Sequence, residues 1–321
     1  MTIVIDSHIP FLVEAVRANW QNVRILPMEP ERIDASTVRD AEVLIVRTRT
    51  KVKEALLADS KIRLVCTATI GFDHIDTAYC EAHGISWISC PGCNAQAVCD
   101  YIEEALKEYQ ISDIRYQISN MPTIGIVGVG HVGLLVEQMA ERKGYRVLLN
   151  DPPKNIGVSL DEIARNCDII TFHVPLDETT QYLCNESFLS QCKQGALIIN
   201  AARGGVVDEQ ALLRSGHPYI LDTWENEPNI NPDVLQQAFL ASMHIAGYSV
   251  EGKRNASQMC LNAITEHFGL PRIKITKTRY HVIKTENKSN EPHWLAAITS
   301  QLKMNPNSFE SLRRSYPLRG E

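Results

Sequence analysis

The chain has 321 residues, of which 44% are hydrophobic and 22% are charged, with a formal net charge of −6. This length exceeds one small core and fits two domains plus a further segment. No apolar run is long enough to span a bilayer, and Met1–Asp6 enters a strand-like pattern at once, so we expect neither a transmembrane helix nor a signal peptide. Nine scattered cysteines are typical of a reducing cytoplasm, where we place the protein.

The first 93 residues alternate strand-like and helix-like patterns, which is typical of a parallel α/β unit. The predicted elements are strands Thr2–Asp6, Val43–Val46, Arg63–Thr69 and Ile85–Ser89, with helices around Pro10–Asn19 and Val52–Asp59. The turn Cys90-Pro-Gly-Cys93 follows them. It has the spacing of a metal or redox pair, but no second pair completes a zinc site. We therefore expect two small, partly buried residues and no metal.

A glycine-rich turn stands at the centre of the chain. The buried strand Thr123–Val127 runs into Gly128-x-Gly130-x-x-Gly133, and an amphipathic helix follows. Gly128 permits the tight turn, Gly130 lets a pyrophosphate approach the backbone, and Gly133 lets the helix pack against the strand. The helix N-terminus offers N–H groups to phosphates. Such a turn also occurs in other α/β domains, for example those that bind S-adenosylmethionine.

The next strand ends at Asp151, 18 residues beyond Gly133. A carboxylate at this distance accepts hydrogen bonds from the adenosine ribose and repels a 2′-phosphate. The pattern therefore favours NAD over NADP as the cofactor.

Further strands after the turn complete a second α/β unit, which the predicted helix Ala95–Tyr109 precedes. They are Tyr145–Asn150, Ile169–Val174, Ala196–Asn200, Tyr219–Leu221 and Ser242–Ile245. The fold class is therefore α/β, with two doubly wound parallel-sheet domains, Rossmann-like or flavodoxin-like, and a small C-terminal α+β segment. A cleft between two such units is a usual place for a cofactor and a small substrate.

The composition changes after Pro271. A strand-like alternation at Ile273–Ile283 and a polar break at Lys284–Glu291 precede two predicted helices, Trp294–Leu302 and Ser308–Tyr316. From Pro271 onward, ten Lys and Arg stand against four Glu, whereas the preceding residues carry 22 basic and 34 acidic side chains. The basic residues are dispersed, so we expect a subunit contact or an anionic substrate and neither nucleic acid nor a membrane.

The last three predicted strands each end on or near an ionisable residue, namely Arg203, Glu227 and His244. The carboxyl ends of parallel strands face one crevice, so these side chains should gather there. The trio suits oxidation of an alcohol beside a carboxylate: the guanidinium holds the carboxylate, and the histidine takes the hydroxyl proton while the carboxylate keeps it basic and oriented. Each residue alone has an ordinary structural explanation, but three at successive strand ends favour catalysis.

Several motifs resemble, in order and spacing, those of the D-2-hydroxyacid dehydrogenase family. They are Gly128–Gly133 with Asp151, His173–Leu176, Asn200–Gly204, Asp222–Pro228 and His244–Tyr248. Within the family, a second set is similar to members that act on 4-phospho-D-erythronate in vitamin B6 biosynthesis. This set is Val46–Val52, Thr67–His74, Pro91–Asn94, Asn150–Pro153 and Phe309–Tyr316. Met243 departs from the proline that the family often has before the histidine.

The resemblance implies the site residues. The catalytic set would be Arg203, Glu227 and His244, with Glu227 rather than Glu225 beside the histidine. The cofactor would contact Gly128, Gly130, His131, Val132, Gly133, Asp151, Val174, Pro175, Asp222 and Gly247. The substrate would contact Thr48, Thr69, Gly71 and Tyr248. Charge alone suggests Arg47 or Arg49, and Arg313 or Arg314 from a partner subunit, for a substrate phosphate.

The resemblance also implies the organisation and the reaction. Residues 1–93 with 247–269 would bind the substrate, 94–246 would bind NAD, and 270–321 would form a homodimer contact. The implied reaction is hydride transfer from C2 of 4-phospho-D-erythronate to NAD. Two alternatives stay open: another family member, such as a phosphoglycerate dehydrogenase, and a non-catalytic NAD(H)-sensing protein.

Overall fold

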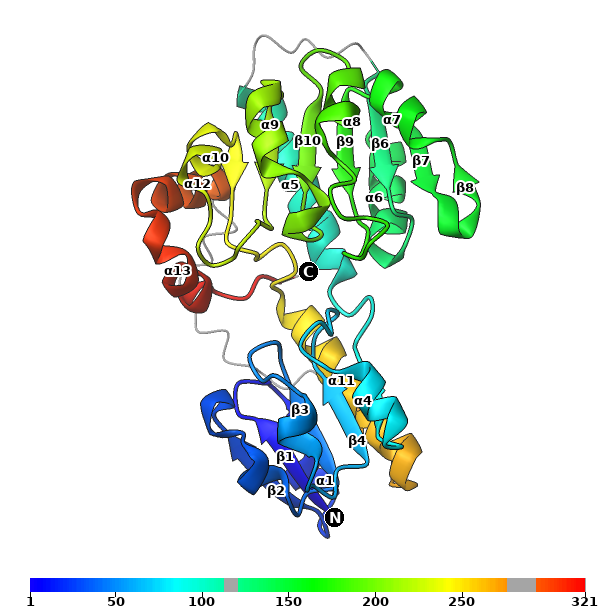
Figure 1. Cartoon of the computed structure of the whole chain (residues 1–321), viewed down its shortest axis with the longest axis vertical. Coiled ribbons are helices and arrows are strands. Elements are labelled where there is room, and N and C mark those ends of the chain that lie inside the picture. The colour runs from blue at the N-terminus through cyan, green and yellow to red at the C-terminus, as the bar shows by residue number, and fades with distance from the viewer. Residues whose placement is uncertain (113–120, 276–292, 321) are drawn as a thin grey trace. The chain divides into compact units, whose positions relative to one another are not determined.

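The computed structural model describes residues 1–112, 121–275 and 293–320. They divide into two compact units (Figure 1). Among the described residues, unit 1 contains Met1–Asn94, the segment from Ser249 to Ile275 and Gly320, and unit 2 contains Ala95–Tyr248 and the tail up to Arg319. No helix in the described ranges is both long enough and apolar enough to cross a membrane.

Unit 1 is built on a five-stranded sheet whose described strand pairs are all parallel. Its strands are β1 (Thr2–Asp6), β2 (Arg24–Met28), β3 (Val43–Val46), β4 (Leu64–Thr67) and β5 (Ser86–Ile88). Its helices are α1 (Leu12–Asn19), η1 (Pro30–Arg32), α2 (Ala35–Val38), α3 (Glu54–Leu57), α4 (Thr77–Ala82) and α11 (Val250–Phe268). The strand order β2-β1-β3-β4-β5 is the flavodoxin-like doubly wound order. Every residue of β3 and β4 is buried, as apolar runs in a parallel sheet require.

Unit 2 is built on a seven-stranded sheet. Its strands are β6 (Thr123–Val127), β7 (Arg146–Asp151), β8 (Ile156–Gly157), β9 (Ile169–Phe172), β10 (Leu197–Asn200), β11 (Tyr219–Leu221) and β12 (Leu240–Ala241). Its helices are α5 (Ala95–Ser112), α6 (His131–Arg142), η2 (Pro152–Lys154), α7 (Leu160–Asn166), α8 (Glu186–Gln191), η3 (Gly204–Val206), α9 (Glu209–Ser215), α10 (Pro232–Gln237), α12 (Trp294–Met304), η5 (Pro306–Ser308) and α13 (Phe309–Ser315).

The order of strands in unit 2 places a binding crevice. The sheet runs β12-β11-β10-β9-β6-β7-β8, and only the β7–β8 pair is antiparallel among those described. The chain therefore reverses its direction across the sheet between β6 and β9. In open α/β sheets, ligands bind outside the carboxyl ends of the strands at such a switch point. The two parallel sheets confirm the predicted α/β fold class.

Most predicted strands have the observed bounds, or nearly so, but the last one does not, and β2 and β8 are missing from the prediction. β2 contains Pro27 and is an edge strand, where proline is tolerated. β12 ends at Ala241, so the strand predicted at Ser242–Ile245 is wrong, and those residues form a loop. Most of the pattern predicted at Ile273–Ile283, and all of that at Lys284–Glu291, lies outside the described residues.

The tail helices share the core of unit 2. Trp294, Leu295 and Phe309 are buried in the same apolar cluster as the sheet. Glu108 of α5 caps α12, because its two carboxylate oxygens accept the N–H groups of Leu295 and Ala296, each at 3.0 Å. The tail is thereby joined to the sheet by both apolar burial and hydrogen bonds.

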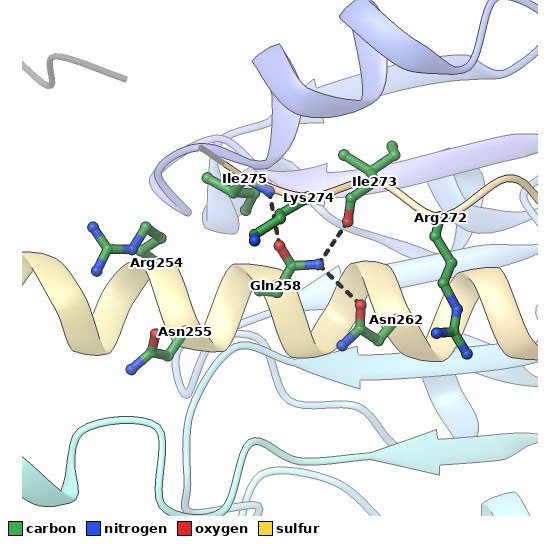
Figure 2. A pocket seen from close by; sticks show the side chains of 8 residues that line it. All are labelled: Arg254, Asn255, Gln258, Asn262, Arg272, Ile273, Lys274 and Ile275. Atoms are coloured by element: carbon green, nitrogen blue, oxygen red, sulfur yellow. Dashed lines mark hydrogen bonds between the residues drawn. The ribbon is translucent and has the colours of Figure 1, made fainter. Parts of the chain in front are cut away.

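The segment after α11 is fastened in unit 1 by the amide of Gln258. Its Nε2 donates to the carbonyl of Ile273 at 2.7 Å, and its Oε1 accepts the N–H of Ile275 at 2.8 Å (Figure 2). A cavity of about 380 Å³ lies beside these residues, and the predicted site residues are not among those that line it. Its lining is Arg254, Asn255, Gln258, Asn262, Arg272, Ile273, Lys274 and Ile275.

Candidate active site

The three residues predicted to be catalytic follow three neighbouring strands. Arg203 comes after β10, Glu227 after β11 and His244 after β12, and these strands are adjacent in the sheet. Two of the loops pack backbone on backbone, because a Cβ added at Gly204 would lie 2.0 Å from the carbonyl oxygen of Trp224. The sheet order therefore brings the Arg203 loop against the loop that carries Glu227.

His244 and Glu227 are hydrogen-bonded to one another. The Nδ1 atom of His244 lies 2.9 Å from Oε2 and 3.2 Å from Oε1 of Glu227. The N–H of Trp224 donates to Oε1 at 2.9 Å and fixes the carboxylate. Burial acts to raise the pKa of Glu227, but the bond to His244 and the neighbouring charge outweigh it, and the pKa lies below its usual value. Glu227 is therefore ionised at neutral pH.

The loop that carries His244 is organised by Asp222. Oδ1 of this buried carboxylate accepts hydrogen bonds from the Ser242 hydroxyl at 2.6 Å and the Ile245 N–H at 2.7 Å, and Oδ2 accepts the Ala246 N–H at 2.9 Å. His244 itself has a φ of 58°, in the left-handed region. By binding residues on both sides of His244, Asp222 fixes the turn that orients the His244 side chain. The predicted contacts of Asp222 and Gly247 with the cofactor stay predictions.

Arg203 lies half-buried at the start of η3. Its Nη1 donates to the carbonyl of Ala202 at 2.8 Å. Asn200, at the end of β10, closes the turn, because its Nδ2 donates to the Arg203 carbonyl at 2.8 Å and its Oδ1 accepts the Ala202 N–H at 3.0 Å. A guanidinium held on a closed turn is suited to bidentate binding of a carboxylate.

The glycine turn has the shape that each glycine was expected to give it. Gly128 has a φ of 93°, and a Cβ there would lie 2.7 Å from the His173 backbone. A Cβ at Gly133 would lie 2.0 Å from the Gly128 carbonyl oxygen, so α6 packs directly on the turn. A Cβ at Gly130 would meet nothing within 4 Å. The open backbone at Gly130 fits the approach of a pyrophosphate.

The predicted cofactor residues next to the turn lie at its edges. His131 and Val132 begin α6, and Val174 and Pro175 follow β9, the strand beside β6. A Cβ at Gly128 would lie 2.8 Å from Cγ1 of Val174, which places that side chain against the turn. All four residues therefore border the switch point of the sheet.

Asp151 ends β7 and accepts the N–H of Val129 at 2.9 Å on Oδ2. Lys154, which belongs to none of the sequence motifs, donates to the Val129 carbonyl at 2.6 Å and lies 3.4 Å from Oδ2 of Asp151. The only sequence signal was a cation three residues after the acid. Together they place a carboxylate and an ammonium at the glycine turn.

A burial effect acts on His173, which follows β9. Desolvation lowers its pKa to about 4, so the ring is neutral at physiological pH. Its Nε2 lies 3.1 Å from the Thr171 hydroxyl. This residue is therefore an uncharged neighbour of the glycine turn.

The sequence of this chain is similar to those of known proteins. A model of the NAD binding domain of D-isomer specific 2-hydroxyacid dehydrogenases matches residues 99–246. The erythronate-4-phosphate dehydrogenase of Bacteroides fragilis is 40% identical over 100% of this chain and 97% of its own length. The chain belongs to the erythronate-4-phosphate dehydrogenase family. It is an NAD-dependent dehydrogenase, as the motifs predicted.

Other comparisons agree. The erythronate-4-phosphate dehydrogenase of Pseudomonas fluorescens is 36% identical over 100% of this chain and 93% of its own length. The NAD⁺-bound 3-phosphoglycerate dehydrogenase of Entamoeba histolytica has a TM-score of 0.73 and 24% identity, over 86% of this chain and 99% of that one. The D-lactate dehydrogenase of Aquifex aeolicus has a TM-score of 0.66 at the same identity, over 83% and 95%. These solved structures support the fold.

The predicted substrate residues of this family member divide between the units. Thr48 follows β3 and is exposed, and Thr69 and Gly71 follow β4, the adjacent strand of unit 1. The Thr69 hydroxyl donates to the Gly71 carbonyl at 2.9 Å and lies 2.6 Å from the Thr67 hydroxyl. Tyr248 lies in unit 2, in the loop after His244. Three of the four therefore follow the carboxyl ends of two adjacent strands in unit 1.

Two of the arginines suggested for the phosphate have acidic partners in unit 1. Nε of Arg47 lies 2.8 Å from one oxygen of buried Asp6 and Nη2 lies 3.1 Å from the other. This bidentate pair neutralises the Asp6 carboxylate, and the contact of Arg47 with a substrate phosphate stays a prediction. Arg49 lies 3.9 Å from Glu31 across a more exposed surface.

The two tail arginines, one of which was suggested to reach the phosphate from a partner subunit, differ in their contacts within the chain, and that suggestion stays a prediction. In the structure, Arg313 of the same chain donates from Nε to the hydroxyl of Tyr248 at 3.1 Å and lies 4.0 Å from Oε2 of Glu227. Arg314 instead pairs with Glu310 at 3.0 Å, and 62% of its side chain is exposed. The tail therefore brings one cation to the His244–Glu227 pair of its own chain.

The Cys90–Cys93 turn has the ordinary structural role expected of it. Both side chains are buried, and the Cys90 thiol donates to the carbonyls of Thr67 and Ala256 at 3.3 and 3.4 Å. The hydrogen bond with Cys260, together with burial, holds the pKa of this thiol far above its usual range, which keeps it protonated.

Proposed function

We propose that the protein oxidises 4-phospho-D-erythronate at C2 with NAD, giving 2-oxo-3-hydroxy-4-phosphobutanoate for pyridoxine 5′-phosphate biosynthesis. The hydrogen-bonded pair of His244 and Glu227 carries the proposal, because an oriented base is what alcohol oxidation requires. Identity of 40% to an erythronate-4-phosphate dehydrogenase over the full chain supports the substrate.

His244, Glu227 and Arg203 have different roles in the oxidation of the alcohol. Because the Glu227 carboxylate accepts from Nδ1 of His244, the ring keeps its proton on Nδ1 and leaves Nε2 free to take the hydroxyl proton. Arg203 binds the C1 carboxylate in two places and fixes C2. The ionised Glu227 then stabilises the protonated ring. NAD, when bound, supplies the hydride acceptor.

The chain has a suitable place for the dinucleotide. The open backbone at Gly130 and the N-terminus of α6 would hold the pyrophosphate, and Asp151 would accept hydrogen bonds from the adenosine ribose hydroxyls. With NAD held in this way, its nicotinamide would extend toward the carboxyl ends of β10, β11 and β12, where the catalytic residues lie.

Spectrophotometry on the purified protein tests the reaction. We expect NADH production with 4-phospho-D-erythronate and far less with 3-phosphoglycerate or D-lactate. A 2-oxo acid is added as an acceptor, so that turnover is seen even when NADH stays bound. Preference for 3-phosphoglycerate would assign the protein to another branch of the wider family. Absence of NADH production on every 2-hydroxy acid, with NADH binding intact, would favour a sensing role.

The substrate phosphate is assigned to Arg313. This side chain is 26% exposed and lies between Tyr248 and Glu227, at the catalytic pair. Arg313→Met should raise KM for the phosphorylated acid at least tenfold, because one charge-assisted hydrogen bond is lost. KM for unphosphorylated D-erythronate should change much less. Arg314→Met is the comparison variant for total tail charge. An unchanged KM in the double variant of Arg313 and Arg314 would remove the tail from the phosphate site.

The protein is further proposed to act as a homodimer in the cytoplasm. The basic tail supports a subunit contact. The free state of all nine cysteines supports a reducing compartment. Light scattering on the eluting protein distinguishes a dimer from a monomer directly.

A further inference from the structure

Arg319 is a buried cation whose partners are main-chain carbonyls. Only 6% of the residue is exposed. Its Nη2 donates to the carbonyls of Ala97 at 3.3 Å and Ile245 at 3.2 Å, and also to that of Ala246. Its Nε donates to the Tyr248 carbonyl at 3.3 Å. Three of these four acceptors belong to the five residues that begin at His244.

Aromatic rings complete the surroundings of the guanidinium. Its central carbon lies 5.2 Å from the ring centroid of Trp294 and 6.0 Å from that of Tyr101. Such positions over ring faces are favourable for a cation removed from water. Carbonyl dipoles and ring faces thus compensate the buried charge, so the guanidinium is built into this place.

The same loop is held from its other side by Asp222. That carboxylate accepts the N–H groups of Ile245 and Ala246, while Arg319 donates to the carbonyls of the same two residues. The N–H and the carbonyl of both residues are therefore bound by buried charges. Asp222 directly follows β11, and Arg319 comes from the tail, which α13 connects to the body of unit 2.

We propose that Arg319 is a positioning residue for catalysis: it fixes the loop Ile245–Tyr248 and, through it, the direction of His244 and the position of Tyr248. This proposal deepens the proposed function and rests on it. A displacement of about 1 Å in such a group can reduce a rate by roughly 10²-fold, which sets the size of the expected effect.

Substitution of Arg319 tests the proposal by turnover. Arg319→Met keeps an apolar stem and removes all donors, Arg319→Lys keeps a charge with a different geometry, and Arg165→Met removes an exposed arginine of α7 as the control. We expect Arg319→Met to lose kcat by about 10- to 100-fold while KM for NAD changes little, with Arg319→Lys between it and the wild type. Added ethylguanidinium should restore part of the kcat of Arg319→Ala. Wild-type kcat in Arg319→Met would overturn the proposal.

Hydrogen–deuterium exchange provides a readout that needs no substrate, so failure of the proposed function can be told from failure of this inference. In Arg319→Met, faster exchange confined to peptides that cover Ser242–Ser249 would support the positioning role. Uniformly faster exchange across unit 2, or a variant that does not fold and that ethylguanidinium does not restore, would mean that Arg319 is only structural and would overturn the proposal.

Discussion

Nδ1 of His244 and the Glu227 carboxylate share a hydrogen bond of 2.9 Å, at the ends of two strands that the chain visits in succession. This bond fixes the tautomer, since a ring that donates from Nδ1 presents Nε2 as its acceptor. Glu225, two residues before, does something else: its Oε1 accepts the N–H of Glu209 at 3.1 Å. The neighbouring acids of one loop therefore have different roles.

Neutralising Glu227 should impair the chemical step. Glu227→Gln keeps an oxygen for the N–H of Trp224 but loses the negative charge beside the ring, so we expect kcat to fall by about 10²-fold or more. His244→Asn should abolish turnover, and both variants should bind NADH nearly as the wild type does. Steady-state kinetics and fluorescence titration measure these effects. Glu225→Gln is the matched control, and an equal loss of kcat in it would contradict the assignment.

The glycine turn offers a comparison of two alanine substitutions. Gly133→Ala places a Cβ 2.0 Å from the Gly128 carbonyl oxygen, so we expect a loss of stability of about 1–3 kcal/mol or more. Gly130→Ala meets nothing within 4 Å and should melt as the wild type does, yet bind NADH roughly tenfold more weakly, because a methyl group occupies the path of the pyrophosphate. Normal NADH affinity in Gly130→Ala would place the pyrophosphate elsewhere.

Local sequence patterns predicted the sheets and the glycine turn because their causes are local. The apolar runs of β3, β6 and β11 have the predicted bounds, and the three glycines are spaced for one turn. β12 was displaced because it has only two residues, and the apolar pattern continues into the loop that Asp222 organises. Periodicity cannot separate a short buried strand from a buried loop.

Contacts of side chains with main-chain atoms could not be predicted from the sequence. Arg319 binds carbonyl oxygens of residues more than 70 positions earlier, and every residue type has such an oxygen. Arg47, which was suggested for the phosphate, pairs with Asp6, which is 41 residues away on β1, and no local pattern predicted that pair. A basic residue in the sequence does not show which acid will lie beside it after folding.

Glu209 should make stability depend on pH. Burial, together with the charges of Glu225 and Glu227, raises its pKa to about 7 although the N–H of Glu225 donates to it at 2.6 Å. Between about pH 4.5 and about pH 7, the Glu209 carboxyl is protonated in the folded state and ionised in the unfolded state. The free energy of unfolding therefore falls as pH rises through this range. Glu209→Gln keeps the acceptor oxygen without the charge.

The variant should consequently be more stable than the wild type in mild alkali, by up to about 3 kcal/mol, and similar to it in mild acid. Thermal melting of both proteins at about pH 5 and about pH 8 measures the difference. A difference of the same size at both values would show that Glu209 does not titrate in this window.

Asp151 should decide between the two dinucleotides. Asp151→Asn keeps an oxygen for the Val129 N–H and preserves the turn, but it removes the charge that repels a 2′-phosphate. Lys154, now 3.4 Å from that carboxylate, would lose its acidic partner and become available to the phosphate. We therefore expect the ratio of kcat/KM for NADP to that for NAD to rise about tenfold or more, with little change in Tm. Asp151→Ala, which also removes the bond to Val129, should melt at a lower temperature. An unchanged ratio in Asp151→Asn would mean that the adenosine ribose does not reach this carboxylate.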